Sequence, residues 1–343
     1  MALALAEEED INIVIANDPD ADRFCAAERV GGKWHVFTGN EIGIILADHV
    51  FQRYKSRPGF NPGNPRRTLS ATLSLLSSVL VSVFSGSGLI VERLAMLSSA
   101  VSSKMLSHMA KAEGFHHEET LTGFKWLGNK TLVLVSQGYE APYAFEEAIG
   151  YMFFDIVRDK DGIAAAAVFL RLVVEMYERG GTIVGYLNEL YQRYVLFLFL
   201  CVWGGGLMMG RYGYFASRNS YVICEDPGMM TRAFYKLRHS TSSQISYIRV
   251  FNTFPVTRIK DVSLNYDSVT TCEPEDKAVS PSSEMISFEL EGDVVMTLRG
   301  SGTEPKLKYY IEARGATMEE AESVAEGVEI ALRVVFREFG LEG

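Results

Sequence analysis

Alternating and amphipathic stretches of apolar residues follow one another along the chain, which is typical of a protein that mixes strands with helices. Alternation predicts strands at residues 11–15, 286–290, 294–298 and 307–313. Helical spacing predicts helices at residues 1–9, 98–112 and 164–178, and from residues 39 and 317 onward. This order of elements predicts α/β domains followed by an α+β domain.

Two apolar stretches interrupt this order. Residues 69–91 carry no charged side chain and contain seven serines, and residues 194–211 hold an apolar run broken by three consecutive glycines. A helix that crosses a bilayer needs roughly 20 predominantly apolar residues. The second run is too short, and serine and glycine weaken the first. We therefore do not expect either stretch to cross a membrane, and an integral membrane protein is the alternative.

An acidic loop follows the first predicted strand. Asp18, Asp20 and Asp22 occupy alternate positions, so in extended backbone their carboxylates leave one side and repel each other unless a cation neutralises them. Hard cations such as Mg²⁺ take oxygen ligands. An EF-hand is excluded, because Arg23 and Arg29 stand where that loop requires Gly and Glu. The loop predicts a divalent-cation site; an acidic loop that is only solvated is the alternative.

A polar loop at residues 299–306 joins two predicted strands and contains no large apolar residue. Its glycines and hydroxyl residues allow backbone N–H groups to form an anion nest, and basic side chains stand at both ends. An ordinary Gly-Ser hairpin connection is the alternative. The predicted phosphate-binding residues are Arg299, Ser301, Gly302, Thr303 and Lys306.

Together with two further motifs, these loops resemble the α-D-phosphohexomutase superfamily, and within it the eukaryotic type 2 phosphoglucomutase/phosphopentomutase branch. Residues 119–126 resemble a loop that orients a bound sugar phosphate, and residues 144–151 resemble the loop whose carboxylate binds sugar hydroxyls. The resemblance covers most of the chain, with the motifs in the family's order. It implies partial and complete phosphohexomutase α/β domains followed by an α+β C-terminal domain.

The resemblance implies an isomerase, a phosphoglucomutase/phosphopentomutase that acts as an intramolecular phosphotransferase. Its substrates would be glucose 1- and 6-phosphate, or the 1- and 5-phosphates of ribose or deoxyribose, with glucose 1,6-bisphosphate as activator. A phosphoserine donates and recovers the phosphoryl group in that family, and Mg²⁺ neutralises its charge. Ala148 stands where many relatives carry Ser, which weakens the case for hexose specificity. The sequence does not decide whether pentose or hexose phosphates are preferred, and it does not decide the oligomeric state.

The resemblance also implies roles for individual side chains. Arg23 would face the phosphoserine, and Lys160 would reach the reacting oxygen, although a solvated lysine in a turn is the alternative for Lys160. Glu146 would accept hydrogen bonds from two ring hydroxyls. The metal ligands would be Asp18, Asp20 and Asp22. The implied substrate-binding residues are Thr122, Gly123, Lys125, Glu146 and Glu147.

The family's nucleophilic serine lies in a Ser-His-Asn type loop, and no such triplet occurs in this sequence. We therefore expect this chain alone to be inactive, with a noncatalytic sugar-phosphate-binding fragment, or an incomplete gene prediction, as the alternative. The expected domains are residues 1–30, the remnant of a second α/β domain with the metal loop; residues 31–211, a third, sugar-binding α/β domain; and residues 212–343, a phosphate-binding C-terminal domain. The resemblance also implies apolar insertions near 69–91 and 194–211, which would be translated introns, lineage-specific segments or partner-binding segments.

Composition agrees with a soluble enzyme but does not single one out; the resemblance implies a cytoplasmic protein whose partners are small sugar phosphates. The net charge of −10 argues against sequence-independent binding to nucleic acid, which requires a basic surface. The four cysteines are widely spaced and form no CxxC pair, so a reducing compartment is the simplest interpretation. His116 and His117 are adjacent, and neighbouring side chains point apart, so we do not expect them to share a metal ion.

Overall fold

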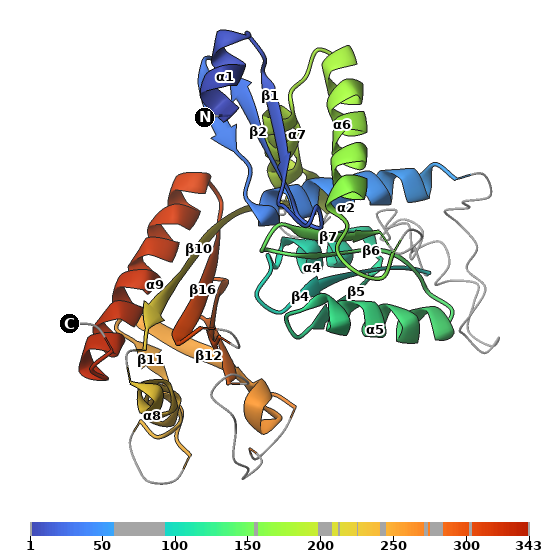
Figure 1. Ribbon diagram of the computed structural model, residues 1–343. Coiled ribbons are helices and arrows are strands. Elements are labelled where there is room, and N and C mark those ends of the chain that lie inside the picture. The colour runs from blue at the N-terminus through green and yellow to red at the C-terminus, as the bar shows by residue number, and fades with distance from the viewer. Residues whose placement is uncertain are drawn as a thin grey trace, which may run out of the picture. The chain divides into compact units, whose positions relative to one another are not determined.

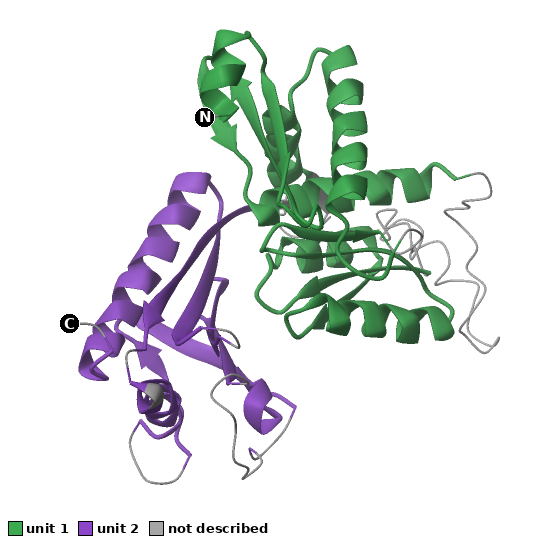
Figure 2. Ribbon diagram, in the orientation of Figure 1, with its two compact units in different colours: residues 1–212 green, residues 213–343 purple. Residues whose placement is uncertain are grey.

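A computed structural model describes residues 2–57, 93–153, 157–197, 208–211, 213–224, 226–240, 245–270, 274, 284–301 and 304–341. The chain divides into two compact units, residues 1–212 and residues 213–343 (Figure 2). The predicted insertion at 69–91 and the middle of the one at 194–211 lie outside the described residues.

The first unit begins with a helix and a three-stranded antiparallel sheet of order β1-β2-β3 (Figure 1). Gly31 and Gly32, with φ of 58° and 78°, form the turn between the second and third strands. The domain boundary expected after residue 30 falls at this turn, between two paired strands of one sheet. The elements are α1 (Ala2–Glu8), β1 (Ile13–Asn17), β2 (Phe24–Val30) and β3 (Lys33–Val36).

A second sheet of this unit has the order β5-β4-β6-β7, in which β4 pairs in parallel with β5 and β6, and β7 is an antiparallel edge strand. Helix α5 packs on one face of the sheet, and α2 and α4 lie on the other (Figure 1). The strands are β4 (Leu94–Ser99), β5 (His116–Thr120), β6 (Glu140–Glu146) and β7 (Gly150–Phe153). The helices are α2 (Gly39–Lys55), α4 (Met105–Glu113), α5 (Phe124–Ser136), α6 (Gly162–Glu178) and α7 (Ile183–Gln192).

The helix predicted at residues 98–112 is wrong over its first seven residues, because β4 continues to Ser99 and α4 begins only at Met105. The intervening serines bond locally instead of extending a helix. Ser99 and Ser102 join their hydroxyl oxygens at 2.7 Å, and Ser103 Oγ accepts the Met105 N–H at 3.1 Å. Serine hydroxyls often compete with helical backbone in this way.

The segment that we interpret as an insertion at residues 194–211 begins and ends in a two-stranded antiparallel ladder. Strands β8 (Tyr194–Phe197) and β9 (Met208–Arg211) pair so that Tyr194 lies opposite Arg211. The first and last residues of the segment are therefore neighbours. Within the described parts of the chain, no helix is both long and apolar enough to cross a membrane.

The second unit is built on an antiparallel sheet of order β10-β16-β15-β14-β12-β11, with β13 paired to β12. Helix α9 covers it through buried apolar residues that include Ala321, Val328 and Phe336, as predicted. Thr317 caps this helix by accepting the Glu320 N–H at 3.1 Å. The elements are β10 (Tyr214–Ile223), α8 (Pro227–Arg238), β11 (Val250–Phe251), β12 (Phe254–Asp261), η1 (Val262–Leu264), β13 (Tyr266–Asp267), β14 (Met285–Leu290), β15 (Val294–Gly300), β16 (Lys306–Gly315) and α9 (Met318–Glu338).

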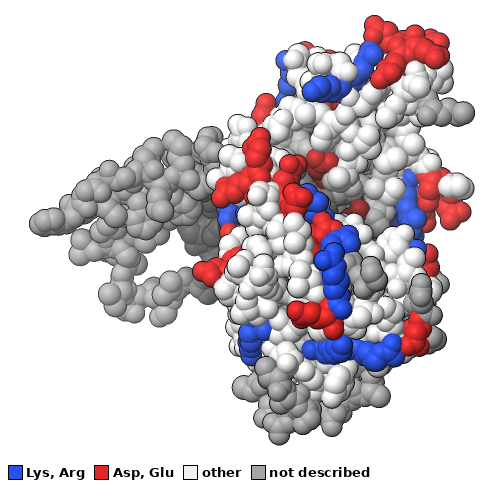
Figure 3. Space-filling model, turned by 90° about the vertical axis from the view of Figure 1, so that its left-hand side faces the viewer, with Lys and Arg blue, Asp and Glu red and all other residues white. Residues whose placement is uncertain are grey.

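Charged side chains of both signs are interspersed on the face of the molecule drawn in Figure 3, and no continuous basic patch covers its described residues. Several of the charges on α9 and β10 neutralise each other. Arg218 lies 3.3 Å from Glu329, which also pairs with Arg333 at 3.2 Å. Arg218 and Arg333 therefore share one half-buried carboxylate.

Candidate functional site

The predicted metal loop forms a tight turn between the antiparallel strands β1 and β2. Ala21, with φ of 57°, donates its N–H to the Asp18 carbonyl at 2.9 Å. Asp18 Oδ1 accepts the Arg23 N–H at 3.0 Å, and Asn17 Nδ2 donates to the Arg23 carbonyl at 2.7 Å. The extended backbone expected through these residues is therefore wrong, because β1 ends at Asn17 and the chain reverses there.

The third aspartate of the turn faces a lysine from a distant part of the sequence. Lys160 Nζ lies 2.8 Å from Asp22 Oδ2, and both side chains are largely shielded from solvent. The hydrogen bond with Lys160 lowers the pKa of Asp22, and the same bond raises the pKa of Lys160. Lys160 is therefore ion-paired, in contrast to the solvated lysine considered as an alternative.

The donor chemistry of the turn suits Mg²⁺, because Asp18, Asp20 and Asp22 offer only carboxylate oxygens within five residues. Their side chains do not gather around one point: the described residues contain no group of three or more His, Cys, Asp or Glu side chains placed to hold a metal ion. Asp18 is bonded to backbone and Asp22 to Lys160, while Asp20 is exposed. Ligation by all three would require these side chains to turn.

Two of the predicted substrate loops meet through one hydrogen bond. The Gly123 N–H donates to Glu146 Oε1 at 2.6 Å, and Gly123 precedes the first turn of α5. A φ of 110° at Gly123 requires glycine. A carboxylate at a helix N-terminus is favoured by the helix dipole. Thr122 is half-buried beside Gly123, and Lys125 is exposed on the first turn of α5.

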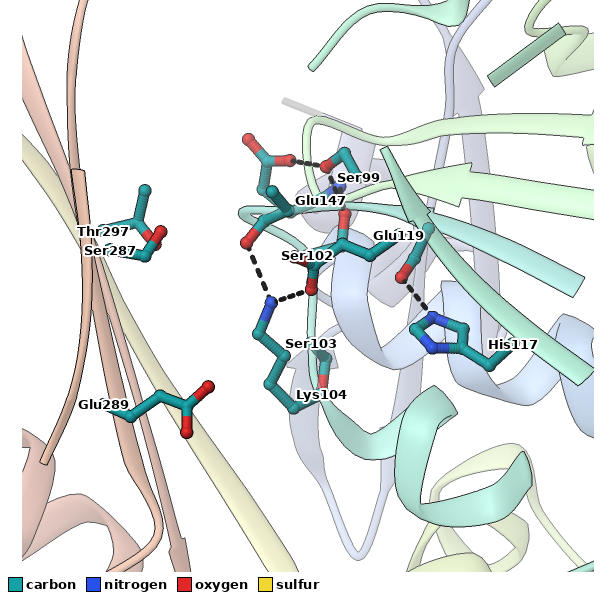
Figure 4. A network of polar contacts seen from close by, with 12 residues as sticks. Ser99, Ser102, Ser103, Lys104, His117, Glu119, Glu147, Ser287, Glu289 and Thr297 are labelled. Atoms are coloured by element: carbon teal, nitrogen blue, oxygen red, sulfur yellow. Dashed lines mark hydrogen bonds and ion pairs between the residues drawn. The ribbon is translucent and has the colours of Figure 1, made fainter. Parts of the chain in front are cut away.

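Glu147 has a different set of partners from its neighbour Glu146. Its N–H donates to Ser102 Oγ at 3.1 Å, and its Oε2 accepts from Ser99 Oγ at 3.4 Å (Figure 4). Ser99 and Ser102 are buried at the carboxyl end of β4. Sequence reasoning missed both serines. The signal was available, since polar residues directly after a parallel strand lie where α/β proteins bind ligands.

Beyond these serines, the β4–α4 connection contains a lysine that sequence reasoning also missed. Lys104 donates to the Ala100 carbonyl at 2.9 Å and pairs with Glu119, which belongs to a predicted substrate loop (Figure 4). This pair fixes residue 119 against the serine-rich turn.

The adjacent histidines of β5 have separate partners. His117 lies 2.9 Å from Ser98 Oγ, and burial lowers its pKa to about 4. His116 lies 3.1 Å from Glu118. Neighbouring residues of a strand point to opposite faces, which accounts for this separation.

The predicted phosphate loop lies in the second unit, between β15 and β16. Ser301 N–H donates to the Lys306 carbonyl at 2.9 Å, which closes the hairpin. Lys306 Nζ lies 2.8 Å from Glu304 and 4.2 Å from the centre of the Tyr221 ring. Gly302 and Thr303 lie outside the described residues. Arg299 lies directly opposite Lys308 in the ladder, so this end of the hairpin carries a further basic residue that sequence reasoning did not select.

Within the first unit, the folded chain brings three predicted motifs together. Gly162, two residues after Lys160, is so close to the acidic turn that a Cβ there would lie 2.5 Å from Asn17 Nδ2. Lys160 Nζ also lies 5.8 Å from the ring centre of Phe124, the residue that follows Gly123. The acidic turn, the lysine and the 122–125 loop are therefore neighbours.

Comparisons with known proteins identify relatives of this chain. Residues 38–194 match the family model described as phosphoglucomutase/phosphomannomutase, alpha/beta/alpha domain III. Over 97% of its length, the chain is 39% identical to a probable phosphoribomutase of Schizosaccharomyces pombe, of which it covers 49%. It is 37% identical to a Homo sapiens phosphopentomutase over 91% of the chain, which covers 44% of that relative. It is 35% identical to a Homo sapiens glucose 1,6-bisphosphate synthase over 91% of the chain, which covers 43% of that relative.

Among solved structures, a phosphoglucomutase/phosphomannomutase family protein from Burkholderia thailandensis superposes with a TM-score of 0.52 at 12% identity. The superposition covers 98% of this chain and 49% of that one, and it supports the fold alone. The chain belongs to the α-D-phosphohexomutase superfamily, as its sequence motifs predicted. Within it, the curated relatives named above include phosphopentomutase and phosphoribomutase, and the chain spans about half of their length.

Proposed function

We propose that this chain provides the sugar-binding and phosphate-binding parts of a phosphosugar mutase, an isomerase that moves a phosphoryl group between two positions of one sugar. The observation that carries the proposal is the contact between loops distant in sequence: Gly123 with Glu146, and Lys160 with Asp22. Relatives named phosphoribomutase and phosphopentomutase favour ribose or deoxyribose 1- and 5-phosphates as substrates, with glucose phosphates as the competitor. Ala148 agrees with that preference.

The proposed roles follow the chemistry of the side chains. Asp18, Asp20 and Asp22 would hold Mg²⁺, which supplies charge neutralisation to a transferring phosphoryl group when bound. Arg23 extends from the same turn and is exposed, so it can approach a phosphate. Lys160, from the adjoining turn, would stabilise or protonate the reacting oxygen.

The sugar itself would be held by the carboxylates at the end of β6. Glu146 has a second oxygen to offer to ring hydroxyls while its Oε1 accepts from Gly123. Glu147 is oriented by Ser99 and Ser102 and would add a second acceptor. Thr122 and Lys125 lie beside Gly123 in the chain and would contact the sugar phosphate from that loop.

The nonreacting phosphate would be bound by the β15–β16 connection. Arg299, Ser301 and Lys306 supply cationic and hydroxyl groups there, and Gly302 and Thr303 complete the same loop in sequence. A site that accepts either phosphate of a bisphosphate allows the sugar to turn around between two transfers.

No Ser-His-Asn triplet occurs in these 343 residues, so the phosphoserine of the proposed cycle would come from sequence outside them. We expect the chain by itself to bind sugar phosphates without turning them over. Glucose 1,6-bisphosphate would prime the complete enzyme. Four cysteines without a CxxC pair favour a reducing compartment such as the cytoplasm.

The test combines a turnover assay with a binding assay on the purified 343-residue chain. The assay supplies ribose 1-phosphate, Mg²⁺ and glucose 1,6-bisphosphate and measures ribose 5-phosphate. We expect no turnover but saturable binding of ribose 5-phosphate, weakened by Glu146→Ala. Turnover that disappears in Asp20→Ala would overturn the noncatalytic behaviour expected of this chain. Absence of both turnover and binding would overturn the proposed function.

A further inference from the structure

Lys160 places a cation against the acidic turn from an element that is distant in the sequence. Its Nζ is 2.8 Å from Asp22 Oδ2 and 3.8 Å from Asp159 Oδ1. Only 24% of the lysine side chain and 32% of the Asp22 side chain are exposed. The ammonium therefore lies against one of the three carboxylates proposed as metal ligands.

The backbone around Lys160 is held against the acidic turn. The Lys160–Asp22 ion pair therefore depends on the position of the backbone as well as on the conformation of the lysine side chain. Asp161 donates its N–H to the Tyr151 carbonyl at 2.9 Å and caps α6 by accepting the Ala164 N–H at 2.9 Å. Gly162 packs directly against Asn17 and Arg23, where a Cβ would have no room. The base of the lysine therefore stays in place while its four-carbon stem can swing.

We propose that Lys160 is an internal counter-cation of the acidic turn, which competes with Mg²⁺ for Asp22 and leaves that carboxylate when the metal binds. This inference rests on the proposed function, because it takes the turn as the metal site. An ammonium and a divalent cation at the same carboxylate oxygen repel each other, so the two occupants exclude one another. The competition is reciprocal. Because both cations bind the same carboxylate, the free energy of the Lys160–Asp22 ion pair must be given up when Mg²⁺ binds there, and the apparent affinity for Mg²⁺ falls by that amount.

The position that Lys160 can take after leaving Asp22 is indicated by its second neighbour. Its Nζ lies 5.8 Å from the Phe124 ring centre, within the range of cation–π attraction. Phe124 follows Gly123, whose N–H is bonded to Glu146. Lys160 thus lies between the acidic turn and the loop proposed to bind the sugar phosphate, so its release from Asp22 would couple metal binding to the arrangement of the substrate loop.

The experiment is an isothermal titration of the full chain with Mg²⁺ at constant ionic strength and pH, with three variants. Lys160→Gln removes the ammonium and keeps a polar side chain, and Lys160→Arg keeps the charge. Lys33→Gln, at an exposed position of β3, removes one positive charge elsewhere. We expect Lys160→Gln to bind Mg²⁺ about tenfold more tightly than the wild type, a change of about 1.4 kcal/mol. Lys160→Arg should stay within about twofold because it keeps the positive charge beside Asp22. Lys33→Gln should also stay within about twofold, since charges at exposed positions are screened.

The outcomes separate this inference from the proposed function. If the wild type binds Mg²⁺, Asp20→Asn weakens that binding, and Lys160→Gln binds no more tightly than the wild type, the metal site stands and the competition is overturned. If neither the wild type nor Lys160→Gln binds Mg²⁺, the metal assignment fails and the inference fails with it. Binding by Lys160→Gln alone would support the inference most strongly. Circular dichroism of each variant shows that it is folded.

Discussion

Glu146 Oε1 accepts the backbone N–H of Gly123 at 2.6 Å, and this bond ties the end of β6 to the start of α5. The carboxylate therefore performs a structural task in addition to the proposed contact with sugar hydroxyls. It satisfies a donor at a helix N-terminus, where the helix dipole favours negative charge.

Replacement of Glu146 should consequently lower stability as well as ligand binding. We expect Glu146→Ala to reduce the free energy of unfolding by about 1–2 kcal/mol, because a helix-end donor loses its charged acceptor. Glu146→Gln should lose less than half as much, since its amide oxygen can still accept. Glu178→Ala, at the exposed end of α6, serves as the control. Urea unfolding followed by circular dichroism measures the differences, and equal stability of Glu146→Ala and wild type would contradict the assignment.

The buried ion cluster of the second unit gives a sharper stability prediction. Arg238 Nε lies 2.6 Å from Asp261 and its Nη2 lies 2.5 Å from Glu284, and all three side chains are buried. Arg238→Met would leave two carboxylates without their cation, which should cost about 3–5 kcal/mol. The matched control on the same helix is Arg232→Met, because the Arg232–Asp226 pair is exposed and should contribute less than about 1 kcal/mol. Unfolding in guanidinium measures the free energy of unfolding of both variants. Similar losses for Arg238→Met and Arg232→Met would contradict the difference expected between a buried and an exposed ion pair.

Close packing between the acidic turn and the start of α6 makes Gly162 sensitive to any side chain. A Cβ there would lie 2.5 Å from Asn17 Nδ2 and 2.7 Å from the Arg23 carbonyl carbon. We expect Gly162→Ala to cost about 1–3 kcal/mol through overpacking. At Gly181 a Cβ would meet only the Met176 carbonyl oxygen at an ordinary 3.5 Å, so Gly181→Ala should be nearly neutral. Thermal unfolding compares the two, and a neutral Gly162→Ala would show that the turn can move away from α6.

The pKa of His117 predicts how stability depends on pH. Burial lowers that pKa from 6.5 to about 4, so between these values the unfolded chain binds a proton that the folded chain does not. The contribution of His117 is fully present above pH 6.5 and is lost as the pH falls toward 4, by up to about 3 kcal/mol.

The measurement is the free energy of unfolding in urea at several pH values between 4 and 7.5. His117→Gln should have a flatter profile than the wild type over this window, whereas His116→Gln should retain the slope. Parallel profiles for His117→Gln and the wild type would contradict the prediction.

Local sequence signals predicted much of the second unit. The alternating residues of β14 and β15 form the expected antiparallel pair, with Leu290 opposite Val294 across the predicted turn. Thr317 begins α9 as expected, since a cap is decided by residues within one turn of the helix. These features depend on neighbours in the sequence, which explains why pattern alone was sufficient.

The candidate site was harder to predict than the second unit, because it depends on contacts between residues far apart in the sequence. The partnership of Lys160 with Asp22 joins two turns from different elements, and periodicity carries no information about such a pair. The reversal after Asn17 was hidden because alternating aspartates fit an extended strand as well as they fit a turn. Likewise, the serines after β4 matched a helical spacing, and their hydrogen bonds with each other and with Glu147 decided the local structure instead.

The most direct test of the proposed sugar-phosphate site is an isothermal titration of the 343-residue chain with ribose 5-phosphate in the presence of Mg²⁺. Wild type should bind at one site per chain. Lys306→Gln should weaken binding at least about fivefold, because a cation that contacts phosphate is worth roughly 1 kcal/mol or more. Lys236→Gln, which removes a half-buried lysine of α8, should bind like the wild type. Equal binding by Lys306→Gln and wild type, or no binding by the wild type, would contradict the proposed site.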